Sequence, residues 1–453
     1  MSYDAGMGMY TLITAGFHLF ITVFSILIVT QVMSINLSYS NEHSDMQVMM
    51  GPNSLWQSRS DCGEMAVWDV SMVMCMPIAL ADMPMTMLMV HGNGFANRAW
   101  QSGSRGRTDS FSTNMAMFDL GTTVGANHYL NIDLMLTTEL WSVPRRGYPL
   151  LAQIGESDQS GDPYIDAQHP HSSPIMGLTF SDTIRLNEDK DFLKVFIAPR
   201  GESTDGPIAF MHRLTGIVNP NAPLGHHVGQ DVGHISGSLI GGTLKLGQDR
   251  FEASIFSGAE PNPSQVNLPL ERPDSFSLRY IRELGENGLF MMSFANLNDH
   301  HSSDQDHINQ RRYSLSHYYQ AHFGGNWSIY HSFIYGGVSK YDEIPFLSSI
   351  ADEFLIKDHS NRFWSRFEAL QRTPDQLMIK NQISSHERSW VYAFTLGYSR
   401  NLVSWEGTEL NMGGLWTQSV LPQVFRSSYG GNPFSAQVFI QLGGMHMWDL
   451  SQR

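Results

Sequence analysis

The segment WVYAFTLGYS, Trp390 to Ser399, contains the residue pattern from which the fold is predicted. Aromatic or bulky apolar residues occupy its even-numbered positions, and mostly smaller residues occupy the odd-numbered ones. Because successive side chains of a β-strand point to opposite faces, this alternation predicts a strand with one apolar face. The same period of two recurs along the chain from about residue 85, in runs such as 130–137, 275–280, 312–316 and 436–442.

Two architectures accommodate strands of this kind. In a soluble sandwich the apolar faces pack inward, whereas in a transmembrane barrel they face lipid and the polar faces line the lumen. Runs of about ten residues suit a tilted membrane crossing. Aromatic residues such as Trp327 and Trp390 lie at run ends, as in interfacial belts. Short turns such as residues 324–326 alternate with longer polar segments, expected at residues 298–310 and 341–361.

We therefore predict an all-β fold, a transmembrane antiparallel barrel of about fourteen strands (12–16), formed by residues 81–453. The last strand is expected at Phe434 to Leu442, with further residues after it. Outer-membrane barrels commonly finish instead on an aromatic residue at the last position of the final strand.

Composition limits the classes of partner. The chain has 453 residues, a net charge of −15 and only 16% charged residues, which argues against binding nucleic acid. Its two cysteines, Cys62 and Cys75, exclude a disulfide-rich scaffold but allow one bridge.

The N-terminal region differs from the rest of the chain. Residues 12–33 are almost continuously apolar, and no lysine or arginine precedes Arg59. We interpret residues 1–35 as a signal sequence that lacks the usual positive start, or as an uncleaved anchor. Residues 36–80 then form a periplasmic segment or a plug of the barrel, or else a disordered linker.

An ordered set of motifs resembles a family of bacterial proteins predicted to be outer-membrane barrels, for which no activity is assigned. The set covers most of the chain from about residue 50, and includes MLMVHGNGFANRAW (Met87–Trp100), YIDAQHPHSSPIMGL (Tyr164–Leu178), AFMHRLTGIVNPNAPLGHH (Ala209–His227) and YGGNPFSAQVFIQL (Tyr429–Leu442). The resemblance implies an exported barrel, and members of the family occur beside metal-handling systems. Ser172 stands where the family usually has an acidic residue after His-Pro-His.

Two of these segments are rich in histidine, the first at Tyr164–Leu178 and the second at Ala209–His227. Pro170 and Pro174 exclude a regular helix around the first, so its histidines are expected where a loop enters a strand. If this loop meets the proline-rich second segment, the histidines would form a cluster suited to a divalent metal or an anion: His169, His171, His212, His226 and His227. Arg213, Asp166 and Gln168 are candidates for organising a loop that constricts the pore. The alternative is that each histidine only braces its own loop.

Another candidate metal site lies in a methionine-rich run, separate from the histidine cluster. If residues 85–91 form a strand, Met85, Met87, Met89 and His91 share one face. Thioether and imidazole groups are ligands for Cu(I) and Ag(I), although methionine also fills irregular apolar space.

These patterns favour a pore or a surface binding protein linked to copper or another transition metal. Its partners would be outer-membrane lipid and a metal ion or small solute, and its oligomeric state is left open. An outer-membrane hydrolase is an alternative, because Ser172 or Ser173, His169 and Asp166 supply the residue types of a triad. No G-x-S-x-G elbow accompanies them, so no catalytic residue is assigned. A purely structural envelope barrel is a further alternative.

Overall fold

A computed structural model describes residues 50, 54–79, 84–158, 160–171, 173–230, 232–258, 266–268, 270–298, 309–324, 326–340, 344–380 and 387–451. The predicted signal or anchor at residues 1–35 lies outside them, as do nearly all of residues 36–53 of the predicted plug or linker, Ser172, and most of the expected 298–310 loop. No helix among the described residues is long and apolar enough to cross a membrane.

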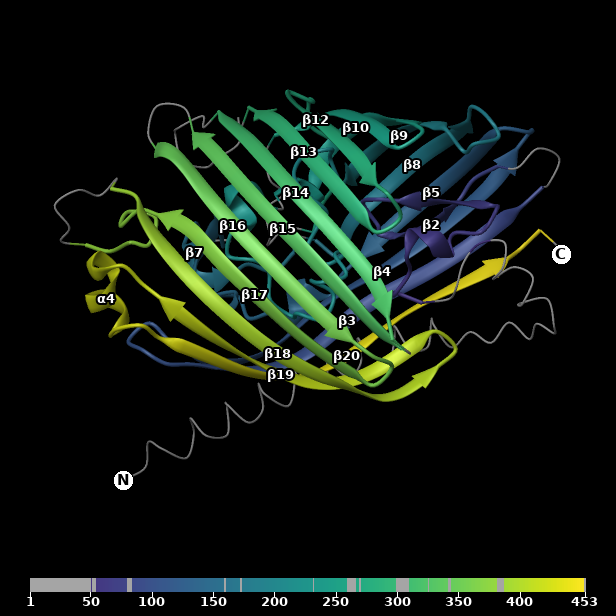
Figure 1. Cartoon of the computed structure of the whole chain (residues 1–453). Coiled ribbons are helices and arrows are strands. Elements are labelled where there is room, and N and C mark those ends of the chain that lie inside the picture. Colours follow the sequence, from purple (N-terminus) through teal and green to yellow (C-terminus); the bar gives the residue numbers. More distant parts are fainter. Residues whose placement is uncertain are drawn as a thin grey trace.

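Sixteen strands of the described chain close into one barrel (Figure 1). They are β3 Thr86–Gln101, β4 Thr108–Val124, β5 His128–Leu136, β8 Ile175–Arg185, β9 Phe192–Gly201, β10 Ser236–Leu246, β11 Asp249–Ser257, β12 Ser275–Leu284, β13 Gly288–Leu297, β14 Gln310–Phe323, β15 Trp327–Lys340, β16 Ile344–Lys357, β17 Asn361–Arg372, β18 Ser389–Trp405, β19 Thr408–Val420 and β20 Phe434–Asp449. Each strand pairs antiparallel with its neighbours, and β20 pairs with β3 to close the ring.

The remaining elements lie between or before the barrel strands. Two hairpins form small sheets of their own, β1 Ala66–Asp69 with β2 Met74–Pro77, and β6 Tyr148–Ser157 with β7 Pro163–Gln168. The helical elements are η1 Arg59–Asp61, α3 Glu139–Ser142, η2 His226–Gln230, η3 Val232–His234 and α4 Gln423–Tyr429.

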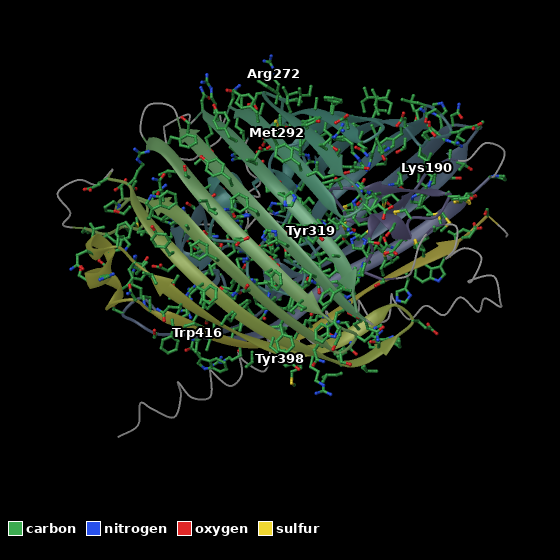
Figure 2. The ribbon with its side chains drawn as sticks, viewed as in Figure 1. Lys190, Arg272, Met292, Tyr319, Tyr398 and Trp416 are labelled. Carbon is green, nitrogen blue, oxygen red and sulfur yellow. A yellow bond between two sulfur atoms is a disulfide. The ribbon has the colours of Figure 1, made fainter. Side chains whose placement is uncertain are left out.

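The barrel wall exposes apolar side chains on its outer face and buries polar ones on its inner face, the reverse of the pattern in a soluble protein. On β18, Phe394 is 41% exposed on the outer face, whereas its neighbour Thr395 is 5% exposed. On β12 the corresponding values are 52% for Leu278 and 0% for Ser277. Figure 2 shows the exposed Met292 on the outer surface of the same wall. A sandwich would bury the apolar face, so the predicted barrel is confirmed and the sandwich is excluded.

The strand number is sixteen rather than about fourteen, at the upper end of the predicted range. One reason is that residues 341–361, expected to be a polar loop, contain β16. Its alternation is concealed because Leu347 and Leu355 face inward, while Asp352 faces outward and bonds to His331 on β15 (Nε2 to Oδ1, 2.6 Å).

The predicted end of the last strand is also wrong. β20 continues beyond Leu442 to Asp449 and pairs with β3 along this extension. Gly443 and Gly444 interrupt the side-chain pattern, but they do not interrupt the backbone ladder, which pairs Gly444 with Gly92.

The barrel has a short-turn end and a long-loop end. Strands are joined at the first by turns such as residues 247–248, 285–287 and 406–407, and at the second by connections such as residues 137–174 and 202–235. In outer-membrane barrels the short turns face the periplasm and the longer loops face outward.

An N-terminal plug, residues 54–79, packs inside the barrel. It contains β1, β2 and a disulfide between Cys62 and Cys75. At the short-turn end, Arg59 forms an ion pair with Glu283 (3.2 Å), and Lys190 donates to the carbonyl oxygen of Gly63 (2.8 Å). The plug therefore lies against the wall near the turns.

A lumen loop, residues 202–235, enters from the opposite end. Its anchor is Glu353 on β16, whose carboxylate accepts hydrogen bonds from Arg213 (3.1 Å) and Thr215 (2.6 Å) of the loop and from Arg366 of β17 (2.9 Å). Arg213 and Glu353 are each 1% exposed. Charged groups are buried here because they pair with one another.

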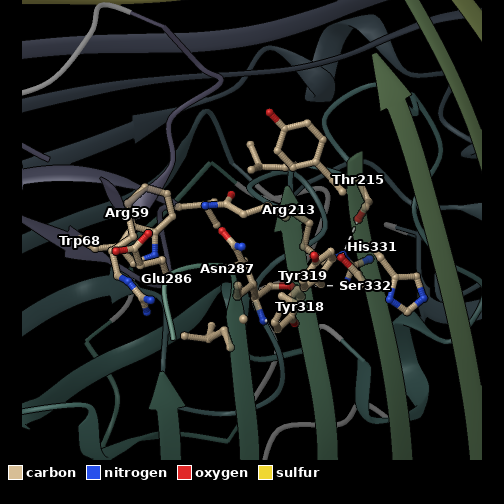
Figure 3. Close-up of a pocket in the computed structure, with 17 residues that line it drawn as sticks. Arg59, Trp68, Arg213, Thr215, Glu286, Asn287, Tyr318, Tyr319, His331 and Ser332 are labelled. Atoms are coloured by element: carbon tan, nitrogen blue, oxygen red, sulfur yellow. Dashed lines mark hydrogen bonds between the residues drawn. The ribbon is translucent and has the colours of Figure 1, made fainter. Parts of the chain in front are cut away.

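The plug and the lumen loop meet inside the barrel. Trp68 and Val73 of the plug share one buried cluster with Ile208 and Leu214 of the loop and with inward-facing residues of the wall. The cavity between them has a volume of about 60 Å³, room for a few water molecules (Figure 3).

Candidate metal centre

Two histidine segments meet at the long-loop end. The first follows β7 and leads into β8, and the second lies in the lumen loop at η2. Their meeting brings one ring nitrogen from each of His169, His226 and His227 within 4.8 Å of the others. Thus three of the five histidines predicted to cluster lie together.

Hydrogen bonding orients the ring of His169. Its Nδ1 lies 2.9 Å from the carbonyl oxygen of Pro170, which only accepts, so Nδ1 carries the proton. In a neutral ring, Nε2 then has the lone pair, and it lies 3.1 Å from Nε2 of His227. Two imidazole ligands on a tetrahedral zinc, each at about 2.0–2.1 Å, would be roughly 3.3 Å apart. The two nitrogens thus already have nearly the spacing of a metal-bound pair.

His226 is the most buried member of the group, with 1% of its surface exposed. Its pKa lies well below the usual value because of burial and, secondarily, because of His234, His169 and His171. The imidazole is therefore neutral at pH 7, the form that binds metals. Its ring centroid lies 4.5 Å from that of His227.

His171 and His234 extend the cluster on one side. Their ring centroids are 5.3 Å apart, and that of His234 is 5.2 Å from that of His226. Glu139 on α3, which is 1% exposed, accepts hydrogen bonds from both Nδ1 (2.7 Å) and the backbone nitrogen (2.8 Å) of His171. This carboxylate–histidine arrangement is the one that orients metal ligands. We did not predict Glu139, because no pattern in the sequence connects it with His171, 32 residues later.

His212 does not lie with this group as predicted. It faces His91 on β3 instead, with their ring centroids 6.2 Å apart. Met85, Met87 and Met89 share the inward side of the wall with His91, and they pack in the buried cluster that also contains plug residues.

The three predicted pore residues are buried and brace the loops. Asp166 accepts from Tyr429 of α4 (2.6 Å) and pairs with Arg105 (3.0 Å), and burial raises its pKa despite that arginine. Gln168 accepts from Gln153 across the hairpin (2.7 Å), and Arg213 anchors the lumen loop through Glu353.

Sixteen antiparallel strands in a closed ring, with an apolar exterior and a polar lumen, define an outer-membrane β-barrel, and the protein resides in the bacterial outer membrane. No family model and no curated protein matches the sequence.

Several solved structures have a similar chain path. OmpF of Salmonella typhi in complex with daunomycin matches with a TM-score of 0.49 and 10% identity, over 80% of this chain and 97% of that one. An anion-selective porin from Comamonas acidovorans matches with a TM-score of 0.46 and 10% identity, over 81% and 100%. A loop-deletion mutant of OmpT from Vibrio cholerae matches with a TM-score of 0.45 and 9% identity, over 80% and 99%.

Proposed function

We propose that the protein captures a divalent transition metal, copper or another, at the long-loop end of the barrel. The observation that carries this proposal is the convergence of ring nitrogens from His169, His226 and His227 within 4.8 Å. Nitrogen from neutral imidazole is a preferred ligand of Zn²⁺, Cu²⁺ and Ni²⁺. A cation would take the place of the single proton that the Nε2 atoms of His169 and His227 can share.

The filled lumen supports binding rather than free diffusion. Among the described residues, the plug and the lumen loop occupy the interior from opposite ends and pack together in one buried cluster, with a cavity of about 60 Å³ between them. We therefore favour a metal-binding barrel over an open pore.

The hydrolase alternative has less support. Nδ1 of His169 donates to the carbonyl oxygen of Pro170, whereas the carboxylate of Asp166 is engaged by Tyr429 and Arg105. A catalytic triad needs that ring nitrogen on the acid. A purely structural barrel differs from the proposal in one measurable respect, because it would not bind metal.

The test is a titration of the full-length protein, folded in detergent, with Zn²⁺ and Ni²⁺. We expect the double variant His169→Asn and His227→Asn to raise the dissociation constant at least tenfold, because two of three ligands are lost. His128→Asn is the control, since His128 lies on β5 at the short-turn end and pairs with Asp182 (2.8 Å). Equal affinity in the wild type and the double variant would refute the proposed site, and no binding at all would favour a structural barrel.

A further inference from the structure

A different set of donor atoms lines the wall where the first and last barrel strands meet. The strand register pairs His91 of β3 with Met445 of β20 on one side and with Met117 of β4 on the other. Met117 in turn pairs with Met135 of β5. The register therefore forms one row across four adjacent strands, which we call the Met–His row: Met445, His91, Met117 and Met135.

The Met–His row faces the lumen. Asn93, two residues beyond His91 and on the same face, donates to the carbonyl oxygen of Ile217 in the lumen loop (3.0 Å). His91 and Met445 are 1% and 0% exposed, and Met117 is 3% exposed. None of these donors is available to lipid.

The row runs across the strands rather than along one of them. Side chains directly opposite each other on paired strands have Cβ atoms about 4.5–5.5 Å apart, whereas residues two apart on one strand are about 6.6 Å apart. Met117 and Met445 are consequently better placed around His91 than Met89, which the sequence pattern had suggested as its companion.

The lumen loop covers this row from the inside. His212 lies against His91, and Met211 packs in a buried cluster with Met117. Met135 of the row and Met72 of the plug border the same cluster.

Among the described residues, His91 has no hydrogen-bond partner at Nδ1 or Nε2, although both atoms are buried. A buried imidazole of this kind calls for an explanation.

We infer that the row is a second metal site, specific for a soft monovalent cation such as Cu(I) or Ag(I). An imidazole nitrogen of His91 and the sulfur atoms of Met117 and Met445 would supply the ligands, with His212 opposite them. Thioethers select soft d¹⁰ ions, and a ligand set without charge in an apolar surrounding favours a single positive charge over two. The histidine cluster offers only nitrogen, so the two sites would differ in the ions they prefer. This inference does not depend on the proposed function.

The test uses Ag⁺, added as nitrate in chloride-free buffer to the folded full-length protein. Leucine has nearly the volume of methionine, so Met117→Leu with Met445→Leu should preserve packing while removing both sulfur ligands. We expect the dissociation constant for Ag⁺ to rise at least tenfold. The control is Met292→Leu, which removes an exposed thioether on the lipid face of β13 and should change nothing (Figure 2).

Two further measurements make the outcome decisive. X-ray absorption of bound silver in the wild type should show sulfur neighbours, and nitrogen or oxygen neighbours alone would overturn the inference even if a variant failed to fold. The His169→Asn and His227→Asn protein should keep its silver affinity, whatever its affinity for divalent ions. If that protein lost silver binding and the methionine variant kept it, silver would occupy the histidine cluster and the row would not be a site.

Discussion

Gly155, on β6, sets the position of His227. It has a backbone φ of +135°, and a Cβ atom added there would lie 2.2 Å from Cδ2 and Nε2 of that ring. Any side chain at residue 155 must therefore displace the ring of His227, a proposed metal ligand. The glycine supports the site without supplying a ligand.

This geometry predicts that Gly155→Ala weakens binding of Zn²⁺ about tenfold, since it moves one of three ligands. Gly161→Ala is the matched control, because Gly161 lies in the same hairpin, also has a positive φ (+81°), and has no atom within 4 Å of an added Cβ. Titration of the two variants in parallel checks the prediction. If both variants lost the same affinity for Zn²⁺, the cause would be backbone strain and not displacement of the His227 ring.

At the residue scale, the sequence was informative about ligand types but not about their grouping. His169, His226 and His227 could be proposed together because both segments contain prolines and were expected in loops at one end of the barrel. His212 was grouped wrongly, since which residues of a long loop reach the wall depends on the path of that loop. Glu139 was missed because its contact with His171 depends on how two connections pack together.

Among the elements, the lumen loop is tied to the wall by a buried carboxylate, that of Glu353 on β16. Glu353 compensates two buried arginines, Arg213 and Arg366, that come from different parts of the chain. Removing one partner from a buried ionic group typically costs about 3–5 kcal/mol, because a charge remains in the interior without compensation.

We predict that Glu353→Gln loosens the lumen loop while the barrel stays folded. Protease added to the protein in detergent should cut within residues 202–235, and conductance in planar bilayers should rise severalfold. Asp352→Asn is the control. Asp352 is the residue next to Glu353 on β16, but it faces outward and pairs with the partly exposed His331 of β15. A loop as resistant to protease as in the wild type would show that Glu353 is not its anchor.

A strand could be predicted from the sequence where apolar outward-facing residues alternate with polar or small inward-facing ones, as on β18 and β12. β16 was missed because the lumen beside it is filled, and a filled lumen accepts apolar inward residues such as Leu347. The count of strands therefore failed where the plug and the lumen loop change the chemistry of the inner face.

At the scale of the whole molecule, the exposed apolar surface makes sense only in a membrane. Leu278→Arg puts a charge on the outer face of β12, where lipid would impose a cost of about 2–4 kcal/mol near the bilayer midplane. Leu186→Arg, at a similarly exposed residue in the turn between β8 and β9, should cost about 0–1 kcal/mol.

The measurement is the urea midpoint of the heat-modifiable gel shift, for both variants refolded into lipid vesicles. We expect a lower midpoint for Leu278→Arg than for Leu186→Arg, which should resemble the wild type. Two indistinguishable midpoints would mean that lipid does not surround β12.

The Met–His row is complete only after the barrel has closed, because it crosses the junction of β20 and β3. Its pair of Met445 and His91 spans the seam between the first and last barrel strands. These strands are far apart in sequence, since the hydrogen bond from Gln441 to Asn93 across the same seam joins residues 348 positions apart. A barrel caught during insertion with its seam open would keep His91 and Met117 on one hairpin but would lack the third donor. If the row binds a soft ion as inferred, tight binding would then distinguish the closed barrel from one whose seam is open.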